Sequence, residues 1–503
     1  MVESITFVII FFIRIIPVFL IAISSNNGVI DIGHADPLLY LGGARAIIQT
    51  GTNPFNFFPP LNFLFIAAFL SLGKGNAIVP LGATAIVGWL TVIGVYLLAK
   101  DLFGKKTALL AAIISGVYPN FIFYGVGFYS ETLALFLIVF SFLMLIKYFL
   151  TSKHSYIFIS GILWGLASQT RGGLHYFSAF IVLAIIVNCY HRGLRSLFQP
   201  IAIFLISIYL TIFSIGIIVS PIMGESSLNS KSGIGSFVHG VNRITTGCAD
   251  YGDINGNIFY DINNRREKWP EGSQLYSDDV MKLDAFHIAL RCIAFVLQDP
   301  SAYLKNSFKK LSCFFSPNQN VIIFVKKTFE ATPPFFTQAA CLVISLFYIV
   351  IICSGLLGLV LSRDPFRPVF VSFIVFYCLL VFFTVGNSKL RLPLMPFFVI
   401  YCSYFIMSFK NGTWKRAFSN RWVLIIILFF LSNSIYKYKE IMLSPAEIQV
   451  QKIELCNQLG FPKTALCLLE HDKGSSHSAS EKERLNRAKA MAQKKLSESH
   501  AAK

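Results

Sequence analysis

The sequence has few charged residues, and acidic residues are especially scarce. Asp and Glu number 25 among 503 residues, and all charged residues together make up 14% of the chain. Hydrophobic residues make up 55%, with 50 Phe among them, and the mean hydropathy is +0.64. Such a composition excludes an ordinary soluble protein, whose surface must face water. It indicates that lipid surrounds most of the chain.

Several familiar motifs are also missing. The sequence has no Walker loop, HExxH, CxxC pair or GxSxG, so ATP-driven transport and known protease chemistry have no support. The run ADYGDINGNIFYD imitates a calcium loop, but Tyr251 occupies the place of the first Asp and the closing Glu is missing, so we interpret it as turns. The net charge of +18 does not predict a nucleic-acid partner, because most Lys and Arg lie in short links between apolar runs.

The ten cysteines show no metal-ligand spacing. If the C-terminal tail lies in an oxidising compartment, Cys456 and Cys467 can pair with each other. Seven others lie in or beside apolar segments and are predicted to be small buried apolar side chains. These seven are Cys189, Cys292, Cys313, Cys341, Cys353, Cys378 and Cys402.

Eleven apolar runs come close to the ~20 residues that a membrane-spanning helix needs. No A-x-A-like cleavage site follows the first run, which is therefore predicted to be a span and not a signal peptide. Segment 59–73 reaches only ~22 Å as a helix, short of the ~30 Å hydrocarbon core, and is predicted to lie at one face of the membrane. The eleven runs are 5–24, 77–99, 107–124, 131–149, 155–170, 174–190, 198–220, 337–361, 369–385, 393–409 and 422–436.

The positions of Lys and Arg in the short links predict the orientation. With 59–73 outside the span count and the N-terminus cytoplasmic, thirteen link cations fall on one side and five on the other. Cytoplasmic links are enriched in Lys and Arg, so the richer side is predicted to be cytoplasmic. The segments predicted to lie outside are 25–76, 125–130, 171–173, 221–336, 386–392 and 437–503.

We therefore predict an all-α polytopic membrane protein of about eleven transmembrane helices, with outer juxtamembrane helices and a small outer lobe. A catalytic transmembrane module spans residues 1–220 and includes the outer loop 25–76. The extracytoplasmic lobe, 221–336, contains an amphipathic stretch, LDAFHIALRCIAFVLQ. Further transmembrane helices occupy 337–436, and 437–503 form a charged, partly disordered tail.

The first outer loop contains the leading catalytic candidate. Asp36 has Tyr40 and Ala44 at i+4 and i+8, on one side of a helix. A partly desolvated carboxylate at the mouth of a membrane cavity is a stronger general base, but Asp36 can equally cap this helix ahead of Pro37. His34 stands close by, as a hydrogen-bonding residue or, less favoured, a metal ligand.

A second carboxylate, Glu131, opens the span 131–149 after Ser130. Capping by Ser130 and the helix dipole would explain its position. Carboxylates at membrane depth are nevertheless functional candidates, and Glu131 is one of very few in this sequence.

Three cations lie on the predicted outer side, where the charge rule disfavours them. Arg171 is flanked by two glycines at a break between spans, which favours a functional role. Lys389 and Arg391 lie in GNSKLRLPLMPFF; for Lys389, contact with lipid phosphates at the surface is the better explanation. An anionic lipid head group would need such cations.

In its order of motifs the chain resembles the GT-C superfamily of membrane glycosyltransferases, in particular the protein O-mannosyltransferase and aminoarabinose transferase branch. Asp36, Tyr40 and Ala44 match that family's outer Asp-Glu-x-x-Tyr-x-x-x-Ala motif, with Pro37 in place of the Glu. Pro59-Pro60, the LLAKDLFGKKTALLAAIISGVYPNFIFY region and Glu131 follow in the same order. GLASQTRGG places Arg171 at the family's Lys position, and GNSKLRLP resembles its Arg-x-x-x-Pro stretch.

The resemblance implies a membrane transferase that takes a sugar from a polyprenyl-phosphate donor on the extracytoplasmic face of the plasma (inner) membrane. It implies inversion at the anomeric carbon, with Asp36 as general base, Glu131 orienting the acceptor or the Asp36 region, and Tyr40, His34, Arg171, Lys389 and Arg391 binding substrate. The acceptor is a protein, lipid or glycan. No cofactor is predicted; loss of the motif's Glu argues against metal assistance without excluding a divalent metal.

Two alternatives stay open. An O-antigen polymerase or ligase is also polytopic and has a large outer loop, but it would not need Asp36 so early in the chain. A lipid or solute transporter without covalent chemistry predicts charges deep in mid-span or broken-helix repeats. Arg14 is the main mid-span charge in the sequence.

Overall fold

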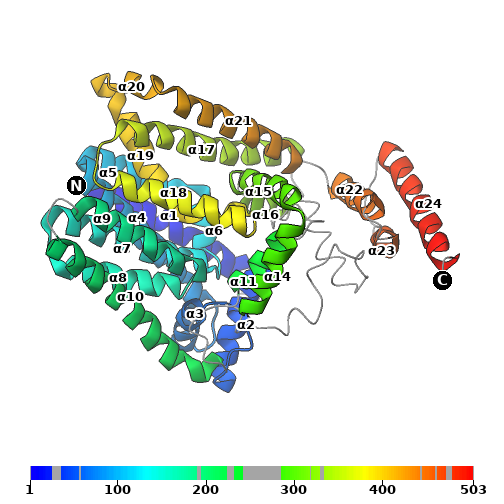
Figure 1. Ribbon diagram of the computed structural model, residues 1–503, viewed down its shortest axis with the longest axis horizontal. Coiled ribbons are helices and arrows are strands. Elements are labelled where there is room, and N and C mark those ends of the chain that lie inside the picture. The colour runs from blue at the N-terminus through cyan, green and yellow to red at the C-terminus, as the bar shows by residue number, and fades with distance from the viewer. Residues whose placement is uncertain are drawn as a thin grey trace. The chain divides into compact units, whose positions relative to one another are not determined.

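A computed structural model describes most of the chain (Figure 1). All regular elements of the described residues are helices, which confirms the predicted all-α class. The helices form two compact units: residues 1–233, 323–377 and 391–429 form unit 1, and residues 234–322, 378–390 and 430–503 form unit 2. The described residues are 2–24, 35–55, 58–189, 194–223, 232–241, 285–317, 319–328, 333–441, 445–458, 462–471 and 479–501.

Unit 1 contains most of the long apolar helices. Helices α7 and α8 pack against each other, α7 also packs against α4, and α17 packs against α19. Five elements run across the division between the units: α11 (Ser232–Val241), α16 (Gln319–Thr328), α18 (Arg367–Phe383), η3 (Ser388–Leu394) and α21 (Arg421–Ile441). The elements wholly in unit 1 are α1 (Val2–Ser24), α2 (Ala35–Thr50), α3 (Leu61–Leu72), α4 (Ile78–Phe103), α5 (Lys105–Val117), α6 (Pro119–Gly125), α7 (Ser130–Thr151), α8 (His154–Ser168), η1 (Gly172–Phe177), α9 (Ser178–Cys189), α10 (Leu194–Met223), α17 (Pro334–Leu361), α19 (Met395–Ser408), η4 (Phe409–Asn411) and α20 (Lys415–Phe418).

The predicted count of eleven spans is not confirmed. Among the described residues, eight helices are long and apolar enough to cross a membrane, or nine if the bent pair α5–α6 counts as one span. These nine, together with the shorter helices α8 and α18 of 15 and 17 residues, correspond to the eleven predicted apolar runs. The 12-residue α3 is ~18 Å long, too short to cross the hydrocarbon core, in keeping with a position at the membrane face.

The predicted span 107–124 is broken in the structure. Pro119 cannot continue the hydrogen-bond ladder, Tyr118 before it has an extended backbone, and α5 and α6 meet at 58°. Pro119 has no N–H for the carbonyl of Ser115, four residues earlier. Arg14 of α1, which is 1% exposed, donates to this carbonyl at 2.8 Å and also donates to the carbonyl of Phe121. The mid-span arginine therefore satisfies the Ser115 carbonyl, which the proline leaves without an N–H partner.

Contacts at the two ends of unit 1 agree with alternating helix directions. At one end, Glu3 of α1 bonds to Tyr96 near the end of α4 and pairs with Lys105 at the start of α5 at 3.2 Å. At the other end, the backbone N–H of Leu61, at the start of α3, donates to the carbonyl of Gln169 beyond α8 at 3.0 Å. The links with many predicted cytoplasmic cations and the predicted outer segments thus lie at opposite ends of these helices.

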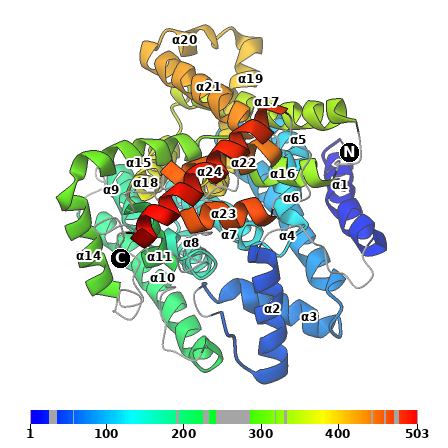
Figure 2. The same ribbon diagram turned by 90° about the vertical axis from the view of Figure 1, so that its right-hand side faces the viewer.

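Helices α2 and α3 pack together at the end of unit 1 that was predicted to lie outside (Figure 2, blue). Gly43 permits this contact, since a Cβ there would lie 2.5 Å from the ring of Phe63. Tyr40, 4% exposed, lies against Phe58 and Phe63, with ring centroids 5.3 and 4.8 Å away. The α2 side chains are thereby fixed on a buried aromatic layer.

Unit 2 contains α14 (Ala285–Gln298) and α15 (Pro300–Phe314), together with most of α11. The predicted amphipathic stretch lies in α14. Its residues Ile288, Cys292 and Phe295 pack against Val238 and Val241 of α11. Helix α15 begins with Pro300 at its first position and Asp299 at its N-cap, whose carboxylate accepts from the N–H of Ala302 at 3.1 Å.

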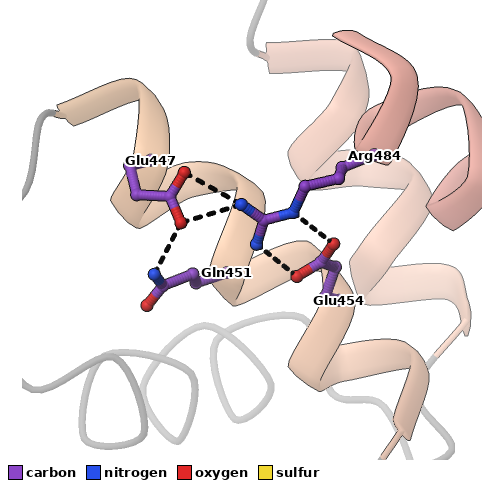
Figure 3. Close-up of polar contacts among 4 residues, drawn as sticks. All are labelled: Glu447, Gln451, Glu454 and Arg484. Carbon is purple, nitrogen blue, oxygen red and sulfur yellow. Dashed lines mark hydrogen bonds and ion pairs between the residues drawn. The ribbon is translucent and has the colours of Figure 1, made fainter. Parts of the chain in front are cut away.

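The tail of the chain forms three helices in unit 2, α22 (Pro445–Gln458), α23 (Pro462–His471) and α24 (Ala479–Ala501), which pack against one another. Figure 3 shows Arg484 of α24 between two carboxylates of α22, with Glu447 and Glu454 at 2.9 and 2.7 Å. The charged α24 is therefore joined to the other tail helices by a bidentate ion-pair network.

One prediction about cysteines is wrong: Cys456 and Cys467 form no disulfide with each other. Cys313 is buried, as predicted, and is also disulfide-bonded, which the sequence analysis did not predict. The apolar setting of Cys313 near the end of α15 concealed this role, because a buried thiol and a buried disulfide favour the same surroundings.

Candidate functional site

The centre of the candidate site is an ion pair between Glu131 and Arg171, both in unit 1. Their side chains are 4% and 15% exposed, and Oε1 of Glu131 lies 2.6 Å from Nη1 of Arg171. Glu131 lies in the first turn of α7, and Arg171 lies between α8 and η1 with an extended backbone. Because α7 and α8 run antiparallel and pack closely, the start of one helix lies beside the end of the other. The fold thus joins two residues that the sequence suggested separately.

Tyr40 brings α2 to this pair. Its hydroxyl is hydrogen-bonded to the Ser130 side chain, and Glu131, Asp36 and Arg171 act on it electrostatically. Burial is the main reason that the pKa of Tyr40 lies well above its usual value, and the neighbouring carboxylates raise it further. Tyr40 is therefore a neutral hydroxyl in the middle of a charged cluster.

Asp36 lies one turn before Tyr40 on the same side of α2, and its side chain is partly buried. The helix begins at Ala35, which places Asp36 in the first turn and not at the N-cap. The positive end of the helix dipole still favours its negative charge. Tyr40 and Ala44, the other two motif residues, are 4% and 0% exposed, so the motif face of α2 points into the unit.

The second arginine is held differently. Arg391 in η3 is 1% exposed, and its guanidinium carbon lies 4.0 Å from the ring centroid of Tyr348 of α17, a cation–π geometry. Lys389 is partly exposed, and its backbone N–H donates to the side chain of Asn387 at 2.8 Å. These observations describe Arg391 as a buried cation and Lys389 as a partly exposed one.

His34 lies outside the described residues, as does the calcium-loop imitation at Tyr251. Within the described part of the chain, no group of three or more His, Cys, Asp or Glu side chains could hold a metal ion. A residue not singled out from the sequence also joins the cluster: Tyr377 of α18 acts electrostatically on Arg171 and Glu131. Nothing in the apolar run around Tyr377 distinguishes it, so only the tertiary fold reveals this neighbour.

Residues 58–218 match the sequence family described as dolichyl-phosphate-mannose-protein mannosyltransferase. The predicted resemblance to this family is confirmed. The segment of this chain that matches the family contains Glu131 and Arg171, whereas Asp36, Lys389 and Arg391 lie outside it. None of the curated proteins matches the chain.

Among solved structures, the chain is similar to the archaeal oligosaccharyltransferase AglB from Archaeoglobus fulgidus in complex with an inhibitory peptide and a dolichol-phosphate. The identity is 13% and the TM-score 0.47, over 91% of this chain and 58% of that chain. For the apo form of the Archaeoglobus fulgidus oligosaccharyltransferase the values are 13% and 0.48, over 96% and 59%. The chain thus spans less than two thirds of the length of these proteins.

Proposed function

We propose that this chain is a membrane glycosyltransferase of the GT-C type that moves a sugar from a polyprenyl-phosphate donor to an acceptor protein, lipid or glycan. The observation that carries the proposal is the buried Glu131–Arg171 pair beside Asp36 and Tyr40, with the pair inside the segment that matches the mannosyltransferase family. It combines a candidate base with a cation for an anionic leaving group.

In the proposed reaction, Asp36 accepts the proton of an acceptor hydroxyl or amine. The acceptor atom attacks the anomeric carbon from the face opposite the phosphate, and the bond from that carbon to the phosphate oxygen breaks with its electrons going to the oxygen. The configuration inverts, and the products are the glycosylated acceptor and polyprenyl phosphate. Arg171 stabilises the charge that develops on the phosphate.

The ion pair with Glu131 suits Arg171 to this task. A guanidinium presents five N–H groups in a rigid plane, so a carboxylate on Nη1 can fix the plane while other N–H groups face a phosphate. Glu131 is then a positioning residue for Arg171, and Arg391 is the second cation for the phosphate.

The site is proposed to face the extracytoplasmic side of the plasma (inner) membrane. The disulfide bond of Cys313 supports an outer position for the 221–336 lobe, because disulfides persist in oxidising compartments. Single-cysteine labelling with an impermeant reagent tests this orientation. A cysteine at position 236 should react from outside, and cysteines at 105 and 153 should not; the opposite pattern would show that the assigned orientation is wrong.

The activity is tested by incubating membranes that contain the protein with radiolabelled polyprenyl-phosphate sugars and following the label into protein, lipid and glycan fractions. Asp36→Asn should lower transfer by at least ~100-fold, since general-base catalysis contributes about 10²–10⁴-fold. Asp101→Asn is the matched control, because Asp101 is exposed near the end of α4 that is distant from the candidate site. Normal transfer by Asp36→Asn would remove Asp36 from the mechanism, and no transfer of any such label by the unmodified protein would remove the proposed function.

A further inference from the structure

Unit 2 contains a fully buried lysine that the proposed mechanism does not use. Lys310 of α15 is 0% exposed, and no ion pair of its side chain occurs within the described residues. Its Nζ donates to two backbone carbonyls, that of Gly240 at 3.1 Å and that of Thr384 at 2.9 Å. The ring of Tyr303 covers it, with its centroid 4.7 Å from Nζ. A buried ammonium group is unfavourable, so its persistence here points to a specific task.

Lys310 belongs to a row of donors along one face of α15. The hydroxyl of Tyr303 donates to the carbonyl of Phe383 at 3.2 Å, and the hydroxyl of Ser307 donates to that of Phe382 at 2.9 Å. With Lys310 on Thr384, three side chains at four- and three-residue spacing bond three successive carbonyls. These carbonyls end α18, where no further turn supplies N–H partners. Helix α15 thus caps α18.

Two glycines bring the backbones into direct contact at this junction. A Cβ on Gly240 would overlap the carbonyl oxygen of Thr384, and a Cβ on Gly386 would lie 2.5 Å from the carbonyl oxygen of Lys310. Glycine at both positions therefore lets α11, α15 and the chain after α18 meet at one lysine. We call this contact region the Lys310 junction; it consists of Tyr303, Ser307, Lys310 and their carbonyl partners. Its elements are packed closely together.

Helix α15 is also anchored at its far end. The carbonyl of Ser312 accepts from the side-chain amide of Asn433 of α21 at 3.0 Å, the Ser312 hydroxyl donates back to Asn433, and Cys313 is disulfide-bonded. The carbonyls of residues 382–384 are therefore attached to a braced helix and not to a freely moving loop. The chain that continues from Thr384 reaches Lys389 after five residues and Arg391 after seven.

We propose that Lys310 is a positioning residue for donor binding: by holding the end of α18 through the Thr384 carbonyl, it sets the conformation of the segment that carries Lys389 and Arg391. This inference rests on the proposed function, in which Arg391 helps to bind the lipid phosphate. Lys310 does not touch the substrate. Its side chain instead fixes the backbone at Thr384 and thereby the conformation in which residues 385–391 begin.

The test compares three variants in nanodiscs. Lys310→Met keeps roughly the length of the side chain but removes the hydrogen-bond donor, and Ser307→Ala is a milder change that removes the bond to Phe382. Lys309→Met is the control, on the exposed side of α15. Lys310→Met should raise KM for the polyprenyl-phosphate sugar roughly 10- to 100-fold, the range for a small misplacement of binding groups, with a much smaller change in kcat. Ser307→Ala should shift KM in the same direction and Lys309→Met should leave it unchanged.

A second measurement does not depend on activity. Hydrogen–deuterium exchange of the backbone amides of residues 384–394 should be faster in Lys310→Met than in the unmodified protein and unchanged in Lys309→Met. Unchanged exchange and unchanged donor KM in Lys310→Met would overturn the positioning role. Faster exchange in Lys310→Met, combined with no sugar transfer by the unmodified protein, would support the structural role of Lys310 and reject the proposed function. The two failures are therefore distinguishable.

Discussion

The two units compensate the charge of a buried cation with different chemical groups. In unit 1, Arg171 has a carboxylate partner, Glu131, at 2.6 Å. In unit 2, Lys310 has backbone carbonyl dipoles of Gly240 and Thr384 and the ring of Tyr303. A carboxylate compensates the charge fully, whereas carbonyls and a ring compensate only part of it. Burial accordingly lowers the pKa of Lys310 to about 7.

The two environments suit the two cations to different tasks. A guanidinium that is always charged and held by a carboxylate suits the binding of an anion that arrives and leaves. An ammonium group held by the carbonyls of a helix end suits the fixing of backbone, and its charge depends on pH.

Removing Arg171 should have the largest effect, because it leaves Glu131 buried and unpaired. We expect Arg171→Met to destabilise the protein by about 3–5 kcal/mol, and the double variant Arg171→Met/Glu131→Gln to recover most of this loss. Neither variant should use the donor normally. Thermal unfolding in detergent measures the stability of both variants, and a donor titration of the double variant measures its use of the donor. If the double variant transferred sugar at the normal rate, the phosphate role of Arg171 would be excluded.

Arg391 should show a smaller effect on donor use. Arg391→Ala should weaken the affinity for polyprenyl phosphate by about 1.5–3 kcal/mol, the range for hydrogen bonds to charged groups. Arg391→Lys should restore part of it, since the charge returns without the planar fork. A binding titration in nanodiscs measures the change, and equal affinity in all three proteins would place the phosphate elsewhere.

Lys310 should make stability depend on pH. Its pKa is about 7 in the folded protein, against a usual value of 10.5. Between these values the unfolded chain binds more protons, so the free energy of unfolding rises with pH, by up to about 1.4 kcal/mol per pH unit, and this contribution is lost as the pH falls through 7. Unfolding temperatures at pH 7 and 9 should therefore diverge between the unmodified protein and Lys310→Met. Identical pH slopes in the two proteins would contradict this assignment.

Lys389 should matter least. Its side chain is partly exposed, where water and salt screen its charge. Lys389→Ala should weaken donor use by less than about 1 kcal/mol, as for exposed ionic contacts. A donor titration at low and high salt measures this effect, and a loss as large as that of Arg391→Ala would show that Lys389 belongs to the phosphate site.

The class of fold could be predicted from composition and run length, because lipid imposes those directly on the sequence. The break in 107–124 could be predicted from the sequence, since Pro119 stands inside the run. The contact with Arg14 could not be predicted, because a hydrogen bond across about 100 residues requires the packing of α1 on α5. The sequence indicates Glu131 and Arg171 separately, because each is a rare charge at the end of an apolar run. Their mutual contact follows only from the antiparallel packing of α7 and α8.

The role of Lys310 could be predicted from the sequence only in part. In AYLKNSFKKLSCF, two of the three lysines have the pattern of ordinary surface charges, and only the positions along the helix distinguish the third, Lys310. Tyr303, Ser307, Lys310 and Phe314 then recur at three- and four-residue spacing on one face. That periodicity was available in the sequence. The carbonyl partners were not, because they belong to the end of α18, more than seventy residues later along the chain.

Arg14 has a consequence for how the protein enters the membrane. Its acceptors, the carbonyls of Ser115 and Phe121, lie 101 and 107 residues later in the chain. During synthesis, α1 therefore emerges with a charge whose partners do not yet exist, at a cost of about 2.5–3.5 kcal/mol for an arginine at the centre of a helix in the bilayer. That charge is compensated when α5 and α6 arrive beside α1. The first helix and the broken span therefore reach their final hydrogen bonding together, after α5 and α6 have been made.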